Sequence, residues 1–555
     1  AAFDPRDLGR TVPPLAAAVD RLGTLRGRIE AGLPEGARSD LEWRLDQKER
    51  DLLEALALAH ELDLEVIADQ GDVAPGTTFE VAATLANQGS RAVTVQDLTL
   101  EAPPGWKIDR ELGESGPLAP GKAARFRFRV RVAGDAPSSR PYWHRSKNTD
   151  RYVVDIPADE GRPWSPPDVA ATVRYATDRG VVARLEAPAV VRYEGRWVGG
   201  EKRKVVNVVP AVSVGLSPAV TIMPLAAADR RREFRVVLAA GTAGLGNAVV
   251  RLVAPKGWRV EPPEATVSLA DRGQERVAAF RVLPPPVPGA AEIGIRALAT
   301  VGGKEYTEGY RVVAYDHIQE RHVFRDATAR VVPVDVRIAP GLEIGYVMGT
   351  GDEVAKAIGE LGAPVTLLGE TDLASGDLSR FSTIVTGIRA YQVRRDLRDA
   401  TRRLLRYVEG GGHLVVQYNR LDFNQGGKES PFAPYPGFLV TGDRVSDETA
   451  PIRIRVSDPV LRTPNLLSAA DWDGWIQERG LQFAAVQDPR YLDLLASTDP
   501  FPLNPGEKTG LLVVAAVGKG TWTYTGLSLF RQLPAAVPGA YRVLANLISR
   551  PRPRS

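Results

Sequence analysis

Polar side chains follow three predicted strands in the last third of the chain, at the point where each strand ends. Asp352 comes after the strand at 344–347, and the strands at 381–386 and 414–417 are followed by similar polar groups. Open parallel sheets bind ligands at the carboxyl ends of their strands. We therefore expect a candidate ligand site at this edge, formed by Asp352, Arg389, Tyr391, Tyr418, Asn419, Trp475, Gln477, Glu478, Arg479 and Arg531.

The residue types in this set suit a small polar ligand. Arg389 and Arg479 carry planar guanidinium groups, which bind carboxylates or pairs of sugar hydroxyls. Tyr391 and Trp475 offer flat faces for stacking.

The alternative interpretation is structural. Arg389, Glu478 and Arg531 would then form a buried ion network that fastens loops to the sheet, and such networks are common away from functional sites. The sequence favours this network over a ligand site, and a ligand site over a catalytic one.

A second candidate surface lies in the first half of the chain. Tyr142, Trp143 and His144 form an aromatic cluster within a predicted loop. Aromatic rings stack on the apolar faces of sugars, so the cluster could bind a glycan. Packing within a β-sandwich explains the same residues equally well.

Several other chemistries have no support in the sequence. The chain contains no cysteine, which removes thiolate nucleophiles, disulfides and thiolate metal sites. His317 and His322 lie five residues apart and do not share a helical face, so we expect surface or hinge residues and no metal site. The turn at 349–352 lacks the lysine and spacing of a phosphate-binding loop, and an N-capping turn explains it as well.

Composition limits the class of partner. The 71 Lys and Arg residues nearly balance 68 Asp and Glu residues, leaving a net charge of +3 and no basic block. No nucleic-acid partner is therefore expected. No apolar stretch is long enough to predict a membrane span, and the oligomeric state is left open.

Five regions must position these residues. Apolar residues at helical spacing predict a helical hairpin at 1–62. Alternating strands predict β-sandwiches at 63–137 and 223–333, with a further β unit at 138–222 that is either separate or an elaboration shared by the two. Continuous apolar strands alternating with helices, including one at 394–409, predict an α/β domain with a parallel sheet at 334–555.

The two sandwiches carry an internal repeat. Pro103-Pro104-Gly105-Trp106 matches Pro255-Lys256-Gly257-Trp258, and a phenylalanine follows each tryptophan 22 residues later. A repeat with a spacing of 152 residues predicts two related domains. Both tryptophans are expected to be core or strand-end packing residues.

Several longer motifs resemble a known family. They are Gly345-Tyr346-Val347-Met348-Gly349-Thr350-Gly351-Asp352, Gly387-Ile388-Arg389-Ala390-Tyr391, Gln417-Tyr418-Asn419, Trp475-Ile476-Gln477-Glu478-Arg479-Gly480 and Phe530-Arg531-Gln532-Leu533-Pro534. This set is similar to the class-I glutamine-amidotransferase-like domain at the C-terminus of large bacterial PIG-L (LmbE-type) deacetylase proteins. The Pro-x-Gly-Trp sandwiches resemble NEW3 modules of carbohydrate enzymes. The resemblance implies immunoglobulin-like sandwiches followed by a flavodoxin-like domain.

The resemblance also carries functional expectations. PIG-L deacetylases bind zinc through a His-Pro-Asp-Asp motif, which this chain lacks, so zinc is expected only in a deacetylase domain outside it. Amidotransferases of this fold use a cysteine after the strand that here ends at Gln417, and that turn holds Tyr418 and Asn419. The expected function is a non-catalytic scaffold that binds a glycan and serves a deacetylase domain on the same gene product or another chain, secreted or in the periplasm. An enzyme or ligand-binding site in the α/β domain and a structural role in an extracellular assembly are the alternatives.

Overall fold

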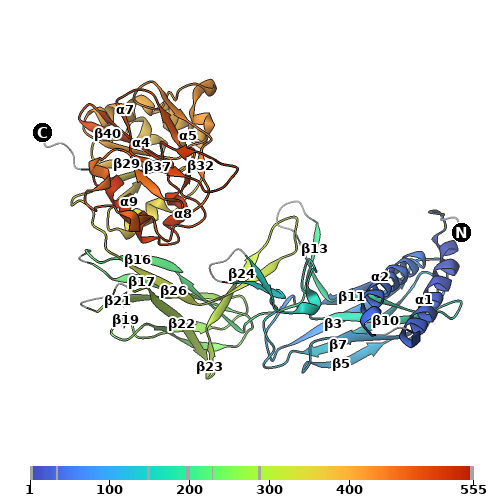
Figure 1. The fold of residues 1–555 in the computed structure, drawn as a ribbon. Coiled ribbons are helices and arrows are strands. Elements are labelled where there is room, and N and C mark those ends of the chain that lie inside the picture. Colours follow the sequence, from blue (N-terminus) through green and yellow to red (C-terminus); the bar gives the residue numbers. More distant parts are fainter. Residues whose placement is uncertain are drawn as a thin grey trace.

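The computed structural model describes residues 4–32, 35–146, 151–194, 200–227, 229–285, 289 and 291–550. Side chains are described throughout this part except at 30–40. The chain forms an N-terminal helical pair, two β-sandwiches and a C-terminal α/β domain, with the sandwiches side by side and the α/β domain above the second of them (Figure 1). Strands dominate, as the alternating patterns predict.

The N-terminal helices pack on the end of the first sandwich. They are α1 (Val12–Gly32) and α2 (Glu35–Ala59). Val12 and Leu56 are fully buried and share one hydrophobic cluster with Val66 and Phe79 of the sandwich. The hairpin is therefore part of this domain's core and not a free linker.

The first sandwich consists of a six-stranded and a four-stranded sheet. The larger sheet has the order β13 (Glu201–Val205), β12 (Val190–Glu194), β1 (Leu62–Ala68), β3 (Thr78–Asn87), β7 (Lys122–Arg131) and β5 (Lys107–Gly113). The smaller has the order β11 (Val182–Pro188), β10 (Ala170–Thr177), β4 (Val93–Glu101) and β6 (Gly116–Leu118). Side chains of β3 and β7 alternate between buried and exposed, because one face of each strand meets the core.

Apart from the two-stranded sheet at 143–154, the described strands of region 138–222 join the sandwiches and form no separate β unit, which corrects one of the two interpretations of it. β10 to β12 complete the two sheets of the first sandwich, where β10 pairs with β4 and β12 pairs with β1 in parallel. The last strands of the region belong to the second sandwich. The first sandwich thus extends well past the expected boundary at 137, because β4 and β1 need hydrogen-bonding partners that lie later in the chain.

The second sandwich repeats this plan. One sheet has the order β15 (Val212–Ser217), β17 (Arg232–Ala240), β21 (Glu275–Leu283) and β19 (Arg259–Glu261). The other has the order β16 (Val220–Pro224), β26 (Thr328–Val334), β22 (Ile293–Val301), β18 (Gly246–Val253) and β20 (Ala265–Leu269), with β23 (Lys304–Tyr306) beside β22. Trp106 and Trp258 are half-buried against the cores of their own sandwiches, where Trp106 meets Phe79 edge-on at 6.2 Å.

The strand after each Pro-x-Gly-Trp turn lies at the edge of its sheet. This strand is β5 in the first sandwich and β19 in the second. Lys107, Asp109 and Glu111 on β5 are exposed, and a bulge interrupts its pairing with β7 between Arg110 and Leu112. Charge and irregularity thus mark an edge that has no further partner strand in the described part of the chain.

The α/β domain has a seven-stranded sheet. Its order is β28 (Val365–Leu367), β27 (Ile344–Val347), β29 (Thr383–Thr386), β30 (His413–Gln417), β40 (Gly520–Thr525), β39 (Leu512–Val517) and β36 (Tyr491–Asp493). The first five strands are parallel, and β39 pairs antiparallel with both β40 and β36. Every residue of β27, β29 and β30 is buried, as the continuous apolar runs predict.

Helices α3 (Val354–Glu360), α4 (Glu370–Ala374), α5 (Ala390–Val393), α6 (Arg395–Asp399), α7 (Thr401–Glu409), α8 (Leu529–Gln532) and α9 (Pro538–Ile548) accompany this sheet. The helix expected at 394–409 is divided between α6 and α7. The Thr401 hydroxyl donates to the Arg398 carbonyl at 2.7 Å at this break, a local bond of the kind that competes with regular helix. No helix among the described residues is long and apolar enough to cross a membrane.

The two junctions between domains differ in character. Ile222 of the second sandwich belongs to the same hydrophobic cluster as Ile344 and Ile358 of the α/β domain. Between the sandwiches, the hairpin of β24 (Glu308–Val313) and β25 (Arg321–Asp326) contacts the first sandwich through charged groups. Lys204 Nζ lies 3.0 Å from Asp72 Oδ2 and 3.1 Å from Glu320 Oε2.

Candidate functional site

Arg389 occupies a sharp turn between β29 and α5. Its φ of 55° and ψ of 24° are left-handed, a conformation that non-glycine residues rarely adopt. The Arg389 amide donates to the Tyr418 carbonyl at 2.9 Å, which joins the ends of two neighbouring parallel strands. Its side-chain Nε donates to Gln392 Oε1 at 2.6 Å. The strained strand-to-helix turn therefore follows β29 and carries an arginine, whereas the resemblance placed such a turn after β30.

Tyr418 and Phe530 form an aromatic floor beside this turn. Their ring centroids lie 5.2 Å apart with the planes inclined by 37°. The Arg531 guanidinium lies over Phe530, 5.0 Å from the ring centroid. An aromatic surface with a cation on it can hold both the apolar and the anionic part of a ligand.

Glu478 is fully buried between two arginines. Its Oε1 accepts from Arg531 Nε at 2.6 Å. Its Oε2 lies 2.8 Å from Arg444 Nε, at an angle that makes this an ion pair without a hydrogen bond. Arg531 also donates to Gln477 Oε1 at 2.5 Å, and Gln477 has a left-handed φ of 65°. The predicted pairing of Glu478 with Arg531 is present, but Arg389 is not part of it.

The electrostatics of Tyr418 show which charges surround it. Burial raises the pKa of the Tyr418 phenol, and Glu478 adds to that increase, whereas Arg389, Arg531 and Arg420 oppose it. The phenol therefore stays protonated at neutral pH and is able to donate a hydrogen bond.

Arg479 and Trp475 do not face this site. Arg479 Nε donates to the Ala450 carbonyl at 2.7 Å, and its Nη1 donates to the Trp472 carbonyl. Burial lowers the pKa of Arg479. Trp475 Nε1 donates to the Asp471 carbonyl at 3.0 Å. Both side chains are buried, and these nitrogen atoms all donate to backbone carbonyls. The two side chains therefore hold loops in place.

Tyr391 and Asn419 lie beneath the site. The Tyr391 ring is buried between Phe423 and Phe432, at centroid distances of 5.1 and 4.9 Å. Burial raises the pKa of its phenol. Asn419 Oδ1 accepts from the Tyr391 amide at 3.2 Å, so this asparagine supports the turn.

Asp352 also has a supporting role. Its Oδ1 accepts from the Tyr346 hydroxyl at 2.5 Å and from the Val354 amide at 3.0 Å, and its Oδ2 accepts from the Ile388 amide at 3.1 Å. The carboxylate thus ties the start of α3 to the turn after β29. These contacts fit the N-capping interpretation of 349–352.

The aromatic cluster of the first sandwich is exposed, with one exception. Trp143 on β8 (Trp143–Arg145) meets Tyr152 on β9 (Tyr152–Val154) edge-on at 4.8 Å. Trp143 is 38% exposed, Tyr152 60% and Trp164 51%. Tyr142 is buried, and its hydroxyl donates to the Arg162 carbonyl at 2.8 Å. The expectation that Tyr142 contacts a glycan is therefore wrong. Its side chain is buried and packs inside the protein, whereas the side chain of Trp143 is exposed.

Polar groups flank these rings. His144 Nδ1 lies 2.8 Å from Asp155 Oδ1. The Arg321 guanidinium lies 4.1 Å from the Trp164 ring centroid. We name Trp143, Tyr152 and Trp164 the aromatic face. Sequence reasoning missed Tyr152 and Trp164, and the available signal was an aromatic residue within the proline-rich stretch at 163–167.

His317 and His322, which were considered above as a pair, lie in different environments. His317 is exposed and stacks on Tyr315 at 5.8 Å. His322 is buried at the junction between the sandwiches, 3.5 Å from Asp72 Oδ1, so of the expected surface or hinge positions the surface one is wrong for this residue. Among the described residues, no group of three or more His, Cys, Asp or Glu side chains could hold a metal ion.

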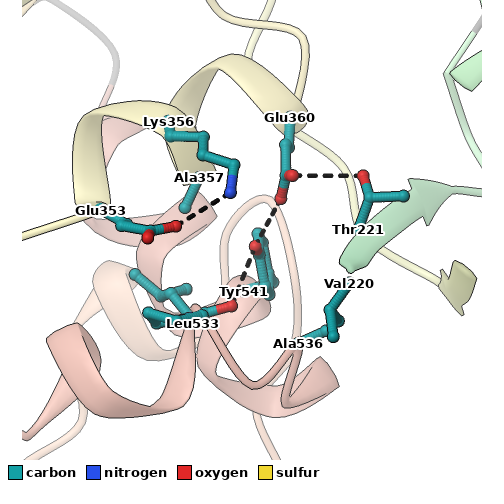
Figure 2. Close-up of a pocket in the computed structure, with 10 residues that line it drawn as sticks. Val220, Thr221, Glu353, Lys356, Ala357, Glu360, Leu533, Ala536 and Tyr541 are labelled. Atoms are coloured by element: carbon teal, nitrogen blue, oxygen red, sulfur yellow. Dashed lines mark hydrogen bonds and ion pairs between the residues drawn. The ribbon is translucent and has the colours of Figure 1, made fainter. Parts of the chain in front are cut away.

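A small pocket lies where the second sandwich meets the α/β domain (Figure 2). Thr221 Oγ1 donates to Glu360 Oε1 at 3.1 Å, and the Tyr541 hydroxyl donates to Glu360 Oε2 at 2.6 Å. Burial and Glu360 both raise the pKa of the Tyr541 phenol. Thr221, Glu360 and Tyr541 are hydrogen-bonded to one another. The pocket is therefore part of the polar contact that holds the two domains together.

Comparison with known proteins identifies one segment. Residues 73–142 match the family described as NPCBM-associated, NEW3 domain of alpha-galactosidase. The match covers β3 to β7, which are five of the ten strands in the two sheets of the first sandwich, and it ends at Tyr142. No curated protein matches the chain.

Solved structures give weaker likenesses. A β-galactosidase from Rahnella sp. R3 is 16% identical with a TM-score of 0.26, over 38% of this chain and 32% of that one. The secreted serine protease VesC from Vibrio cholerae is 8% identical with a TM-score of 0.16, over 44% and 52%. A FixG-related protein from Vibrio parahaemolyticus is 9% identical with a TM-score of 0.14, over 26% and 94%. The chain thus spans about a third of the Rahnella protein, and these TM-scores establish no shared fold.

Proposed function

We propose that this chain is a glycan-binding accessory region of a larger carbohydrate-active protein. The observation that carries the proposal is the aromatic face, which directly follows the segment that matches the NEW3 family. Exposed aromatic rings of this size cost free energy in water, and stacking on a sugar ring buries them. Arg321 and His144 supply hydrogen-bond donors beside the rings.

The test is binding of the whole chain to polysaccharides, by affinity electrophoresis through gels that contain galactans, glucans or chitin-type polymers. The expected result is retardation by at least one polymer, lost in Trp143→Ala and in Trp164→Ala. Trp43→Ala is the matched control, because Trp43 on α2 is 62% exposed and lies away from the aromatic face. Equal retardation of all variants, or none of the wild type, would refute the proposal. In the second case a structural role within an extracellular assembly becomes the better explanation.

We further propose that the parent protein is a PIG-L-type deacetylase and that the α/β domain is its amidotransferase-like domain. The order of the five parallel strands, with β27 between β28 and β29, supports a flavodoxin-like arrangement. None of the five histidines lies in a His-Pro-Asp-Asp motif, so zinc would be held by a separate deacetylase domain. The intact mass of the native protein, with peptide maps of everything that co-purifies, tests this parentage. Absence of any deacetylase sequence would refute it.

The same parentage implies export to the periplasm or the cell exterior. Fractionation of the native cells tests this, since a cytoplasmic pool alone would contradict it. Hydrolysis of a small substrate at Glu478 and Tyr418 is less favoured, because two arginines engage both oxygens of that carboxylate. Turnover that is abolished in Glu478→Gln would revive it.

A further inference from the structure

Four arginines gather at the carboxyl edge of the parallel sheet. Arg389, Arg420, Arg444 and Arg531 surround Tyr418 and Glu478, and we name them the arginine edge. Glu478 pairs with both Arg444 and Arg531, so one negative charge faces two positive charges. Arg389 is bonded to the neutral amide of Gln392, and no ion pair to Arg389 or Arg420 occurs in the described part of the chain. The edge therefore carries positive charge that the protein itself does not balance.

Backbone strain coincides with this charge. Five non-glycine residues have left-handed φ values in the described chain, and Arg389 and Gln477 are both at this edge. Such a conformation costs about 1–3 kcal/mol at each non-glycine residue. Glycine would adopt it without that cost. Arg389 occupies a strained turn, lies beside an aromatic floor and has no carboxylate partner in the described part of the chain. This combination indicates that its side chain binds a ligand.

The neighbouring groups limit the class of ligand. Guanidinium groups bind planar carboxylates through paired hydrogen bonds. Burial moves the pKa of the Tyr418 phenol further above neutral. Tyr418 is buried, so only the partly exposed Phe530 ring offers an apolar surface, and Gln392 and Gln477 offer amide groups beside Arg389 and Arg531.

We propose that the arginine edge binds a small acidic sugar, with its carboxylate on Arg389 and its ring against the partly exposed Phe530. Arg531 and Glu478 position the floor, because the Arg531 guanidinium is fixed above Phe530 by its bonds to Glu478 and Gln477. The site is separate from the aromatic face, so its failure leaves the proposed function untouched. A sugar phosphate presents the same oxyanion chemistry, and the experiment distinguishes the two sources.

The experiment is isothermal titration of the whole chain with D-glucuronate, D-glucose and inorganic phosphate at low ionic strength. We expect glucuronate to bind, glucose to bind at least tenfold more weakly, and phosphate to compete poorly. Phosphate that binds more tightly than glucuronate would overturn the assignment to a carboxylate. Equal binding of glucose and glucuronate, or no binding of either, would overturn the proposal.

Two substitutions separate binding from folding. Arg389→Gly removes the guanidinium and relieves the strained turn, so we expect at least a tenfold loss of glucuronate affinity with an unchanged or higher unfolding temperature. Arg389→Lys keeps the charge but loses the planar fork, and an intermediate loss is expected. Arg251→Gly is the matched control, because Arg251 is exposed and paired with Glu264 on the second sandwich. A large drop in unfolding temperature for Arg389→Gly with unchanged affinity would assign Arg389 a structural role.

Discussion

The two domain junctions of this molecule differ in their chemistry, since one is apolar and the other is ionic. The second sandwich and the α/β domain share one hydrophobic cluster, in which Ile222 and Ile344 are fully buried. The two sandwiches meet instead through Lys204, Asp72 and Glu320, with His322 buried among them. Apolar burial is insensitive to salt and to mild changes of pH, whereas ion pairs respond to both. The second sandwich and the α/β domain should therefore behave as one body, to which the first sandwich is attached by charge.

The two candidate sites lie in different domains, so the two junctions bear on them differently. The aromatic face belongs to the first sandwich, and the arginine edge belongs to the α/β domain. Arg321 over Trp164 links the aromatic face directly to the β24–β25 hairpin of the second sandwich. A ligand on the aromatic face would therefore be sensed at the ionic junction and not at the apolar one.

The largest expected effect comes from the apolar junction. Ile222→Ala removes a fully buried side chain from the shared cluster and should cost about 2–5 kcal/mol in the free energy of unfolding. Urea unfolding measures it, with the second sandwich and the α/β domain losing stability in one transition. Val277→Ala is the control, because Val277 is 57% exposed on the same sandwich. If only one of the two domains lost stability, the two domains would not behave as a single body.

The next effect concerns the ionic junction. Lys204 is held between two carboxylates, and although burial acts against its charge, Asp72 and Glu320 together raise its pKa. Lys204→Met leaves these carboxylates without their cation and should cost about 1–3 kcal/mol. Because the chain has no cysteine, a single introduced cysteine on each sandwich carries a spin label without interference. The distance distribution should broaden in Lys204→Met and stay narrow in Arg251→Met, which breaks only an exposed pair.

Acidification should loosen the same junction by a smaller amount. Burial lowers the pKa of His322 below its ordinary value of 6.5, although Asp72 and Glu320 partly oppose this and Lys204 and Arg321 add to it. The unfolded or separated state therefore binds more protons, so His322 contributes stability above pH 6.5 that is lost as pH falls through the lowered pKa. The labelled pair should show a broader distribution at pH 5.5 than at pH 7.5. A His322→Gln variant with the same pH response would exclude His322 as the cause.

The smallest effect is that of salt. Arg140 pairs with Glu308 across the ionic junction while both remain partly exposed, and such pairs contribute less than about 1 kcal/mol. At about 1 M salt the screening length falls to ~3 Å, which weakens exposed pairs most. The distance between labels on the two sandwiches should broaden slightly, whereas labels on the second sandwich and the α/β domain should not respond. A response at the apolar junction would contradict the comparison.

Parallel strands could be predicted from sequence because burial on both faces requires continuous apolar runs. The runs at β27, β29 and β30 satisfy this requirement and are buried at every residue. The partners of strands in the region 138–222 could not be predicted, since pairing such as that of β12 with β1 joins residues more than 100 positions apart. Alternation shows which face of a strand is buried but not which sheet the strand joins.

The candidate site shows the same limit at the level of side chains. Glu478 and Arg479 are adjacent in sequence, yet one joins the arginine edge and the other binds loop carbonyls. In irregular segments no period fixes the direction of a side chain, so residue type alone placed both in one site. Tyr142 and Trp143 divide in the same way between core and surface.

The charged edge strand β5 has a consequence for the protein before it is assembled. A flat apolar edge offers free backbone groups to any other chain, which is a route to aggregation. The exposed charges of Lys107, Asp109 and Glu111, together with the bulge after Arg110, make this edge a poor template for a second copy. This edge of the first sandwich is therefore protected against pairing with another copy when many newly made chains lie side by side.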